Sequence, residues 1–133
     1  MYLVDTNVWL ERLLDQEHSD EVGRLLARVT PEQLGITDFA LHSIGVVLSR
    51  LQRMDVLLRF VQDVLVDAAV VLIRLEPPDL QRLTEVAEQF RLDFDDAYQY
   101  TAAEKNGLTI VSFDHDFDRT ERGKRTPEEV LGA

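Results

Sequence analysis

The sequence contains no cysteine, so the chain can form neither a disulfide nor a thiolate metal site. It also lacks an apolar run of the roughly 20 residues that a membrane span needs, because Asp67 and Arg74 interrupt its most apolar region. The N-terminus shows no basic segment followed by an apolar stretch, so we expect no secretory signal. Together these absences predict a cytoplasmic protein without a membrane partner.

Basic residues are scarce. The chain has 14 Lys and Arg against 25 Asp and Glu, which gives a formal net charge of −11. A protein this acidic is repelled by phosphate backbones unless cations or a local basic patch reverse the field. For most of these carboxylates a solvated surface is the better interpretation, but the few that follow predicted strands need another explanation.

Several common catalytic motifs are also absent. The sequence has no GxxxxGK[ST], GxGxxG, GxSxG, HExxH or CxxC pattern, so nucleotide-binding and familiar hydrolase classes have no support. Phosphotransfer fits poorly as well. A haloacid-dehalogenase phosphatase needs an acid where this chain has Asn7, and a receiver domain needs a lysine where it has Ser112.

With 133 residues, of which 45% are hydrophobic, the chain is long enough to bury a core, and we expect a single domain over residues 1–133. Short apolar runs predict strands at residues 2–4, 34–36, 70–73 and 108–111. The run at 70–73 is β-branched and unbroken, which predicts a strand buried on both faces. Segments with helical periodicity separate these runs, and Asp93 and Gly107 can cap the two ends of one of them. This alternation predicts a three-layer α/β/α sandwich with a mostly parallel central sheet.

Aspartates stand where predicted strands end or helices begin. Asp5 follows the first strand, Asp96 opens a helix, and Asp114 and Asp116 follow the last strand. In a parallel sheet these positions share one edge, where ligands bind, so the carboxylates can converge. Carboxylates held close together repel one another, and a bound Mg²⁺ or Mn²⁺ ion removes that cost.

Each aspartate has a simpler interpretation when it is taken alone. Asp5 can cap the helix that follows it, with equal weight to a catalytic role. The acids at 93–96 suit a helix N-terminus, and Asp114–Asp116 suits a polar turn, and in isolation both of these structural interpretations are favoured. Their convergence shifts the balance toward a shared site, because capping treats the three places as unrelated.

Three segments, taken in order, resemble the motifs of the PIN-domain ribonucleases, and in particular the small VapC-like toxins. They are Leu3-Val-Asp-Thr-Asn-Val-Trp9, Phe94-Asp-Asp-Ala-Tyr98 and Ile110-Val-Ser-Phe-Asp-His-Asp-Phe117. The resemblance spans nearly the whole chain. It implies a Rossmann-like fold and an Mg²⁺- or Mn²⁺-dependent endoribonuclease that cleaves RNA, with a cognate antitoxin and a homodimer as expected partners.

The resemblance also implies roles for individual residues. The principal metal ligands and catalytic residues would be Asp5, Asp96 and Asp114, with Asp116 assisting. Supporting positions would be Thr6, Asn7, Ser43 and Ser112. The basic segment that follows, with Arg119, Arg122, Lys124 and Arg125, could hold RNA, although an ordinary solvated loop explains it equally well.

One departure from the family pattern concerns Ser43, which stands where the family usually has a glutamate. Asp38 comes more than a helical turn too early to replace that acid, and Asp55 comes far too late. A neutral serine binds a divalent cation much more weakly than a carboxylate does. The alternative function is therefore a weakened or inactive PIN-like module that binds RNA or protein.

The remaining candidates have mainly structural interpretations. For His42 and His115 we favour a hydrogen-bonded structural role over metal or phosphate binding. Trp9 and Tyr98 follow helical apolar stripes and are expected in the core rather than stacked on bases.

Overall fold

The computed structural model describes residues 1–132. Its sheet is parallel throughout, in the order β3-β2-β1-β4, and its strands are β1 (Tyr2–Val4), β2 (Leu34–Thr37), β3 (Val71–Ile73) and β4 (Thr109–Val111). The connections leave β1 in one direction toward β2 and β3, and the chain then returns to place β4 on the other side of β1. The order therefore reverses between β1 and β4, and the crevice beyond such a point is where open α/β sheets bind ligands.

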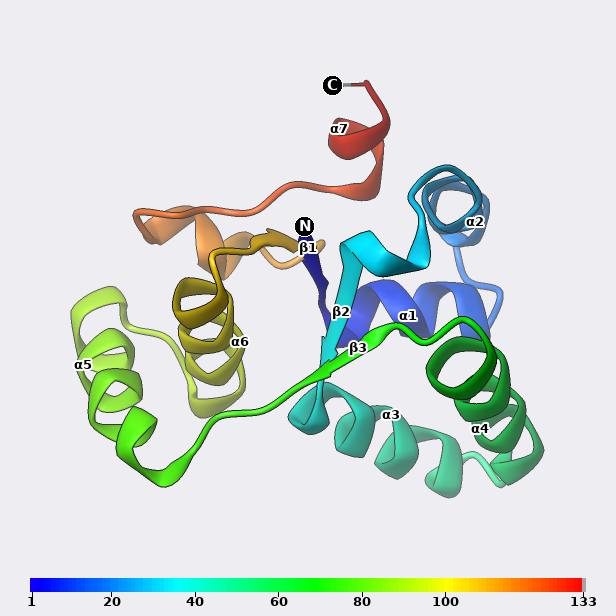
Figure 1. The fold of residues 1–133 in the computed structure, drawn as a ribbon, viewed down its shortest axis with the longest axis horizontal. Helices are drawn as coiled ribbons and strands as arrows, with labels where there is room; N and C mark the ends of the chain where they lie inside the picture. Colours follow the sequence, from blue (N-terminus) through cyan, green and yellow to red (C-terminus); the bar gives the residue numbers. More distant parts are fainter. Residues whose placement is uncertain (133) are drawn as a thin grey trace.

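Helices cover both faces of the sheet (Figure 1). One face is covered by α1 (Thr6–Leu13), α2 (Ser19–Arg28), α3 (Asp38–Arg50) and α4 (Met54–Phe60). The other is covered by α5 (Leu80–Phe90) and α6 (Phe94–Asn106), while α7 (Pro127–Gly132) packs against α2. The predicted three-layer α/β/α sandwich is thus confirmed.

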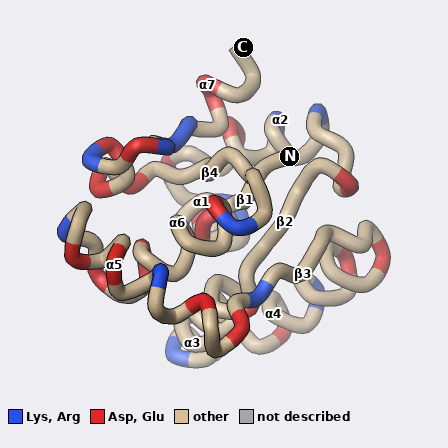
Figure 2. The backbone as a smooth tube through the Cα atoms, turned by 60° about the vertical axis from the view of Figure 1, so that its left-hand side comes forward, with Lys and Arg blue, Asp and Glu red and all other residues tan. Residues whose placement is uncertain are grey.

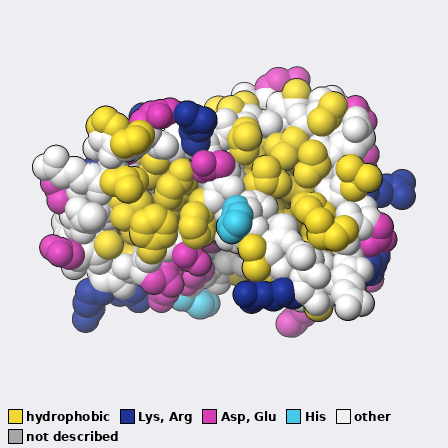
Figure 3. Space-filling model, turned by 90° about the horizontal axis from the view of Figure 1, so that it is seen from below, with side chains coloured by type: hydrophobic (Ala, Val, Ile, Leu, Met, Phe, Trp, Pro, Cys, Tyr) yellow, Lys and Arg dark blue, Asp and Glu magenta, His cyan; other side chains and the backbone are white. Residues whose placement is uncertain are grey.

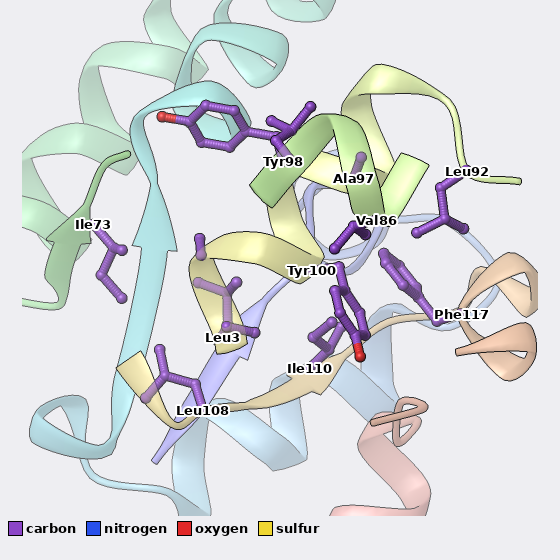
Figure 4. Packing of buried hydrophobic residues seen from close by; sticks show 13 residues of the cluster. Leu3, Ile73, Val86, Leu92, Ala97, Tyr98, Tyr100, Leu108, Ile110 and Phe117 are labelled. Atoms are coloured by element: carbon purple, nitrogen blue, oxygen red, sulfur yellow. The ribbon is translucent and has the colours of Figure 1, made fainter. Parts of the chain in front are cut away.

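The core is divided between the two faces because side chains alternate along each strand. Leu3 and Ile110 point toward α5 and α6, where they join a cluster that includes Tyr100 and Phe117 (Figure 4). Val4 and Val111 belong to the opposite cluster, which contains the apolar faces of α1 to α4. Strands β1 and β4 are therefore covered on both faces, and the side chains that follow them lie at one fixed edge of the sheet.

Both predicted ends of α6 are confirmed. The Asp93 carboxylate accepts a hydrogen bond of 2.9 Å from the backbone N–H of Asp96, which is the geometry of an N-cap. Gly107 ends the helix with φ at +66°, a conformation that glycine adopts without steric cost. The cap holds Asp96 in the first turn of α6.

The prediction that residues 70–73 form a strand buried on both faces is wrong. Val71 is 41% exposed and Leu72 is 52% exposed, and among the described residues β3 pairs only with β2, so it is an edge strand. Only Ile73 of this strand is buried.

Figure 3 shows hydrophobic side chains gathered in two areas on the face seen from below. Apolar areas of this kind are typical of surfaces that bind another protein.

Within residues 1–132, no helix combines the length and the apolar character that crossing a membrane requires.

Candidate functional site

A small hollow of about 200 Å³ lies beyond the carboxyl ends of the central strands. Its lining comes from the residue between β1 and α1, from α1, α3 and α6, and from the segment after β4. The lining residues are Asp5, Thr6, Asn7, Leu10, Phe39, Ser43, Asp95, Asp96, Gln99 and Asp114. Six of the predicted site residues thus line one hollow, although they come from four separate segments: Asp5, Thr6, Asn7, Ser43, Asp96 and Asp114. Their convergence follows from the parallel sheet, because every strand ends at this edge.

Asp5 lies at the centre of a hydrogen-bond network and is 6% exposed. One carboxylate oxygen, Oδ1, accepts from the backbone N–H of Thr6 at 2.8 Å and from Gln99 Nε2 at 2.9 Å. The other, Oδ2, accepts from Ser112 Oγ at 2.7 Å and from Asn7 Nδ2 at 3.4 Å. Burial raises the pKa of Asp5, and the hydrogen bonds from Gln99, Ser112 and Thr6 offset part of that rise.

Ser112 and Asn7 have defined orientations in this network. Ser112 Oγ accepts from the backbone N–H of Asp114 at 2.9 Å and from Asn7 Nδ2 at 3.2 Å, so its own hydrogen points to Asp5. Asn7 Oδ1 accepts from the backbone N–H of Phe113 at 3.2 Å. These two residues connect β1 to the segment after β4 and keep Asp5 and Asp114 together.

The carboxylates of Asp96, Asp114 and Asp116 form a second part of the site. Each offers an oxygen atom, and the three oxygens lie within 4.8 Å of one another. Desolvation, followed by the negative charges of Asp114, Asp93 and Asp5, raises the pKa of Asp96 to about 8. The cluster therefore retains a proton near neutral pH. A bound cation would remove the free-energy cost of holding these negative charges close together.

Asp116 differs from the other acids because it already has a cationic partner. Arg119 Nη1 donates to Asp116 Oδ1 at 3.0 Å, while the same guanidinium donates to the backbone carbonyls of Phe90 and Arg91. This contact fixes the short 3₁₀ turn His115–Arg119 against the link between α5 and α6. Part of the charge of Asp116 is thus balanced within the chain.

The predicted basic segment does not form a free cationic patch over the hollow. Arg122, like Arg119, already has a partner, because it donates to the carbonyl of Leu108. Lys124 pairs with Asp118, and its side chain is 7% exposed. Of the four basic residues in this segment, only Arg125 has a guanidinium with no hydrogen bond or ion pair to residues 1–132. Figure 2 shows acidic and basic positions alternating along this segment, at the upper left.

The histidines and Trp9 lie outside the acidic cluster. His42 lines a separate hollow between α3 and α4, and His115 is exposed, with Nδ1 at 3.3 Å from Asp118 Oδ2. His18 stacks on Phe113 with ring centroids 4.6 Å apart. Trp9 is 1% exposed and packs edge-on against Phe60 in the core, as predicted.

Gln99 is the residue that the sequence argument missed. It lies one turn after Asp96 on α6, so it faces the same side of the helix, and it is 2% exposed. The sequence did contain a signal for Gln99. It is a polar amide that lies three residues after the proposed ligand Asp96 and between two tyrosines, within a buried stretch of α6.

A larger hollow of about 460 Å³ lies elsewhere, between α1, α2, α4 and the π-helix Val61–Asp67 that extends α4. Its lining is mostly apolar, with Arg12, Arg59 and Asp63 as its charged residues. It has no cluster of carboxylates, so the smaller acidic hollow is the better candidate for phosphate chemistry.

Comparison with known proteins gives a family match. The family model of the PIN domain matches residues 2–123. No curated protein matches the chain at a significant level.

Solved structures share the fold at low sequence identity. VapC20 from Mycobacterium tuberculosis, described as a toxin that cleaves the sarcin-ricin loop, is 19% identical with a TM-score of 0.76, over 89% of this chain and 93% of that one. FitAcB from Neisseria gonorrhoeae is 19% identical with a TM-score of 0.77, over 96% and 99%. A toxin–antitoxin complex from Klebsiella pneumoniae is 19% identical with a TM-score of 0.76, over 96% and 98%.

Proposed function

The chain belongs to the PIN-domain family, and on that premise we propose that it is an Mg²⁺- or Mn²⁺-dependent endoribonuclease, the toxin of a toxin–antitoxin pair. One observation carries the proposal: Asp5, Asp96 and Asp114 come from three distant segments and line a single hollow at the switch point of the sheet. Capping alone does not account for this convergence, because Asp96 is buried and is itself held by the cap residue Asp93.

The donor set fits a hard divalent cation. It consists of carboxylate oxygens only, which Mg²⁺ and Mn²⁺ prefer. Desolvation and then neighbouring negative charges raise the pKa of Asp96, and a bound cation would offset both effects. Asp5, Asp96 and Asp114 would hold the ion. We assign Asp116 an assisting role, since Arg119 already pairs with one of its oxygens.

The chemistry of the proposed reaction divides between the ion and the protein. When bound, the ion stabilises negative charge on the phosphate and lowers the pKa of nearby water. Asn7, Ser112 and the backbone N–H of Thr6 hold Asp5 in place through hydrogen bonds, and Ser112 also holds the backbone of Asp114. Among the four basic residues after β4, Arg125 is exposed and its guanidinium has no hydrogen bond or ion pair to residues 1–132, so it is free to meet an RNA backbone.

The same proposal includes protein partners. One of the similar solved structures is a toxin–antitoxin complex, and exposed apolar areas on this chain offer surfaces for an antitoxin and for a second copy of the chain. Antitoxin binding would hold the nuclease inactive in the cytoplasm. Size-exclusion chromatography with light scattering tests the homodimer, for which a molar mass near twice 15.3 kDa is expected.

A direct test of the activity uses single-stranded RNA with Mn²⁺ and then with a chelator. We expect cleavage that depends on Mn²⁺ and is lost in Asp5→Asn. RNA retention without cleavage and without metal dependence would support the alternative function, a PIN-like module that binds RNA or protein. That alternative is favoured by Ser43, which lines the hollow where a further carboxylate would complete the acidic set.

Substitution Ser43→Glu is expected to strengthen Mn²⁺ binding about tenfold or to add a second binding event. The side chain at position 43 lines the acidic hollow, so a carboxylate there adds a charged oxygen donor to the site. Calorimetric titration of Mn²⁺ into the wild type and the variant measures both quantities. The matched control is Ser49→Glu, at an exposed position of the same helix outside the acidic hollow. Equal binding by all three proteins would show that position 43 does not contribute.

A further inference from the structure

Gln99 is a buried amide with partners on two different elements. Its Oε1 lies 2.6 Å from Thr37 Oγ1, at the start of α3, and its Nε2 lies 2.9 Å from Asp5 Oδ1, at the end of β1. These partners are 62 and 94 positions away in the sequence. Burying an amide costs free energy unless its hydrogen-bonding groups are satisfied, so the side chain is held between them.

The neighbours of Gln99 determine which way its amide points. Thr37 Oγ1 accepts the backbone N–H of Ala40 at 2.9 Å, as the N-cap of α3, so its hydroxyl hydrogen is available to donate. That hydrogen can go only to the oxygen of the Gln99 amide, which places the NH₂ group against Asp5. The result is a directed chain of hydrogen bonds from Ala40 through Thr37 and Gln99 to Asp5.

The two oxygens of Asp5 are consequently different. Oδ1 accepts two short hydrogen bonds, from Thr6 at 2.8 Å and from Gln99 at 2.9 Å. Oδ2 accepts one short bond from Ser112 at 2.7 Å and a long one from Asn7 at 3.4 Å. Because a carboxylate oxygen has about two acceptor sites, Oδ1 is saturated and Oδ2 has capacity left.

We infer that Gln99 is a positioning residue for the proposed metal centre. It occupies Oδ1 of Asp5, which leaves Oδ2 as the oxygen available to a cation, and through Thr37 it fixes Asp5 relative to α3, the helix that carries Ser43. The inference rests on the proposed function, since the orientation of Asp5 has a chemical consequence only if Asp5 binds the ion.

The test replaces Gln99 with methionine, which keeps the length of the side chain and removes its hydrogen bonds. Changes to the partners of metal ligands typically weaken metal affinity by about 10- to 100-fold, and we expect a loss in this range for Mn²⁺ measured by calorimetry in Gln99→Met. The matched control is Thr101→Val on the same helix, because Thr101 is also 2% exposed but its Oγ1 has no hydrogen-bond partner within residues 1–132. The control should bind Mn²⁺ as the wild type does.

A second variant decides the matter if Gln99→Met does not fold. Thr37→Val removes the hydroxyl that orients Gln99 and should weaken Mn²⁺ binding at least threefold, whereas Thr37→Ser keeps the hydroxyl and should not. Folded Gln99→Met, or failing that Thr37→Val, with Mn²⁺ affinity within twofold of the wild type would overturn the inference. If the wild type itself binds no Mn²⁺, the proposed function fails, so the two failures can be told apart.

Discussion

Asp96→Asn is expected to lose at least about 100-fold in Mn²⁺-dependent RNA cleavage while its free energy of unfolding rises by roughly 1–2 kcal/mol at pH 7. Activity falls because an amide is a poor substitute for a carboxylate that holds the ion. Stability rises because the raised pKa, about 8, shows that the folded metal-free protein disfavours a charge at this position. Asparagine at position 96 keeps the backbone N–H that Asp93 accepts, and its neutral side chain avoids both the desolvation of a charge and the repulsion from Asp114, Asp93 and Asp5.

The opposite signs of the two effects distinguish a ligand from a structural residue. Cleavage of a single-stranded RNA and urea unfolding in chelator, both at pH 7, measure them. Asp20→Asn is the matched control, since Asp20 also stands in the first turn of an α-helix but is exposed and far from the hollow. It should change neither activity nor stability appreciably. A variant at Asp96 that is less stable and fully active would contradict the assignment.

Mn²⁺ is expected to stabilise the fold, and the effect should grow with pH. At a free concentration 1,000 times its dissociation constant, a ligand that binds only the folded state contributes about 4 kcal/mol. The pKa of Asp96 is raised from 3.8 to about 8, so below pH 8 the metal-free folded site holds a proton that the ion must displace. Mn²⁺ affinity should therefore rise by about tenfold per pH unit between pH 6 and 8 and level off above.

The metal-free protein should show the complementary trend. An acid whose pKa is higher in the folded state than in the unfolded state loses stability as the pH rises between the two values, here from about 4 to about 8. Thermal unfolding across this range, with chelator and with saturating Mn²⁺, measures the difference. If the metal-free and Mn²⁺-bound curves run parallel with pH, Asp96 does not exchange a proton for the ion.

Much of the fold could be predicted because each element carries its own local signal. The apolar run of β1 stops at a charged residue, and the cap residue Asp93 and Gly107 mark the ends of α6 in a way that backbone chemistry dictates. The placement of Asp5, Asp96 and Asp114 around one hollow followed from a topological rule, since parallel strands all end at one edge.

What could not be predicted depends on contacts between distant segments. Val71 and Leu72 have the composition of a buried strand, but β3 stands at the sheet edge, and strand order is not written in local composition. Gln99 meets Asp5 across 94 positions, and no periodic pattern encodes such a pair. The Asp116–Arg119 contact, by contrast, is spaced i, i+3 and could have been anticipated.

The central claim is that a single cation joins Asp5, Asp96 and Asp114. A crystal of the protein grown with Mn²⁺, measured at a wavelength where manganese scatters anomalously, tests it most directly. We predict an anomalous peak in the acidic hollow, in direct contact with oxygens of Asp96 and Asp114 and with Oδ2 of Asp5. A peak at another part of the surface, or none at saturating Mn²⁺, would contradict the account.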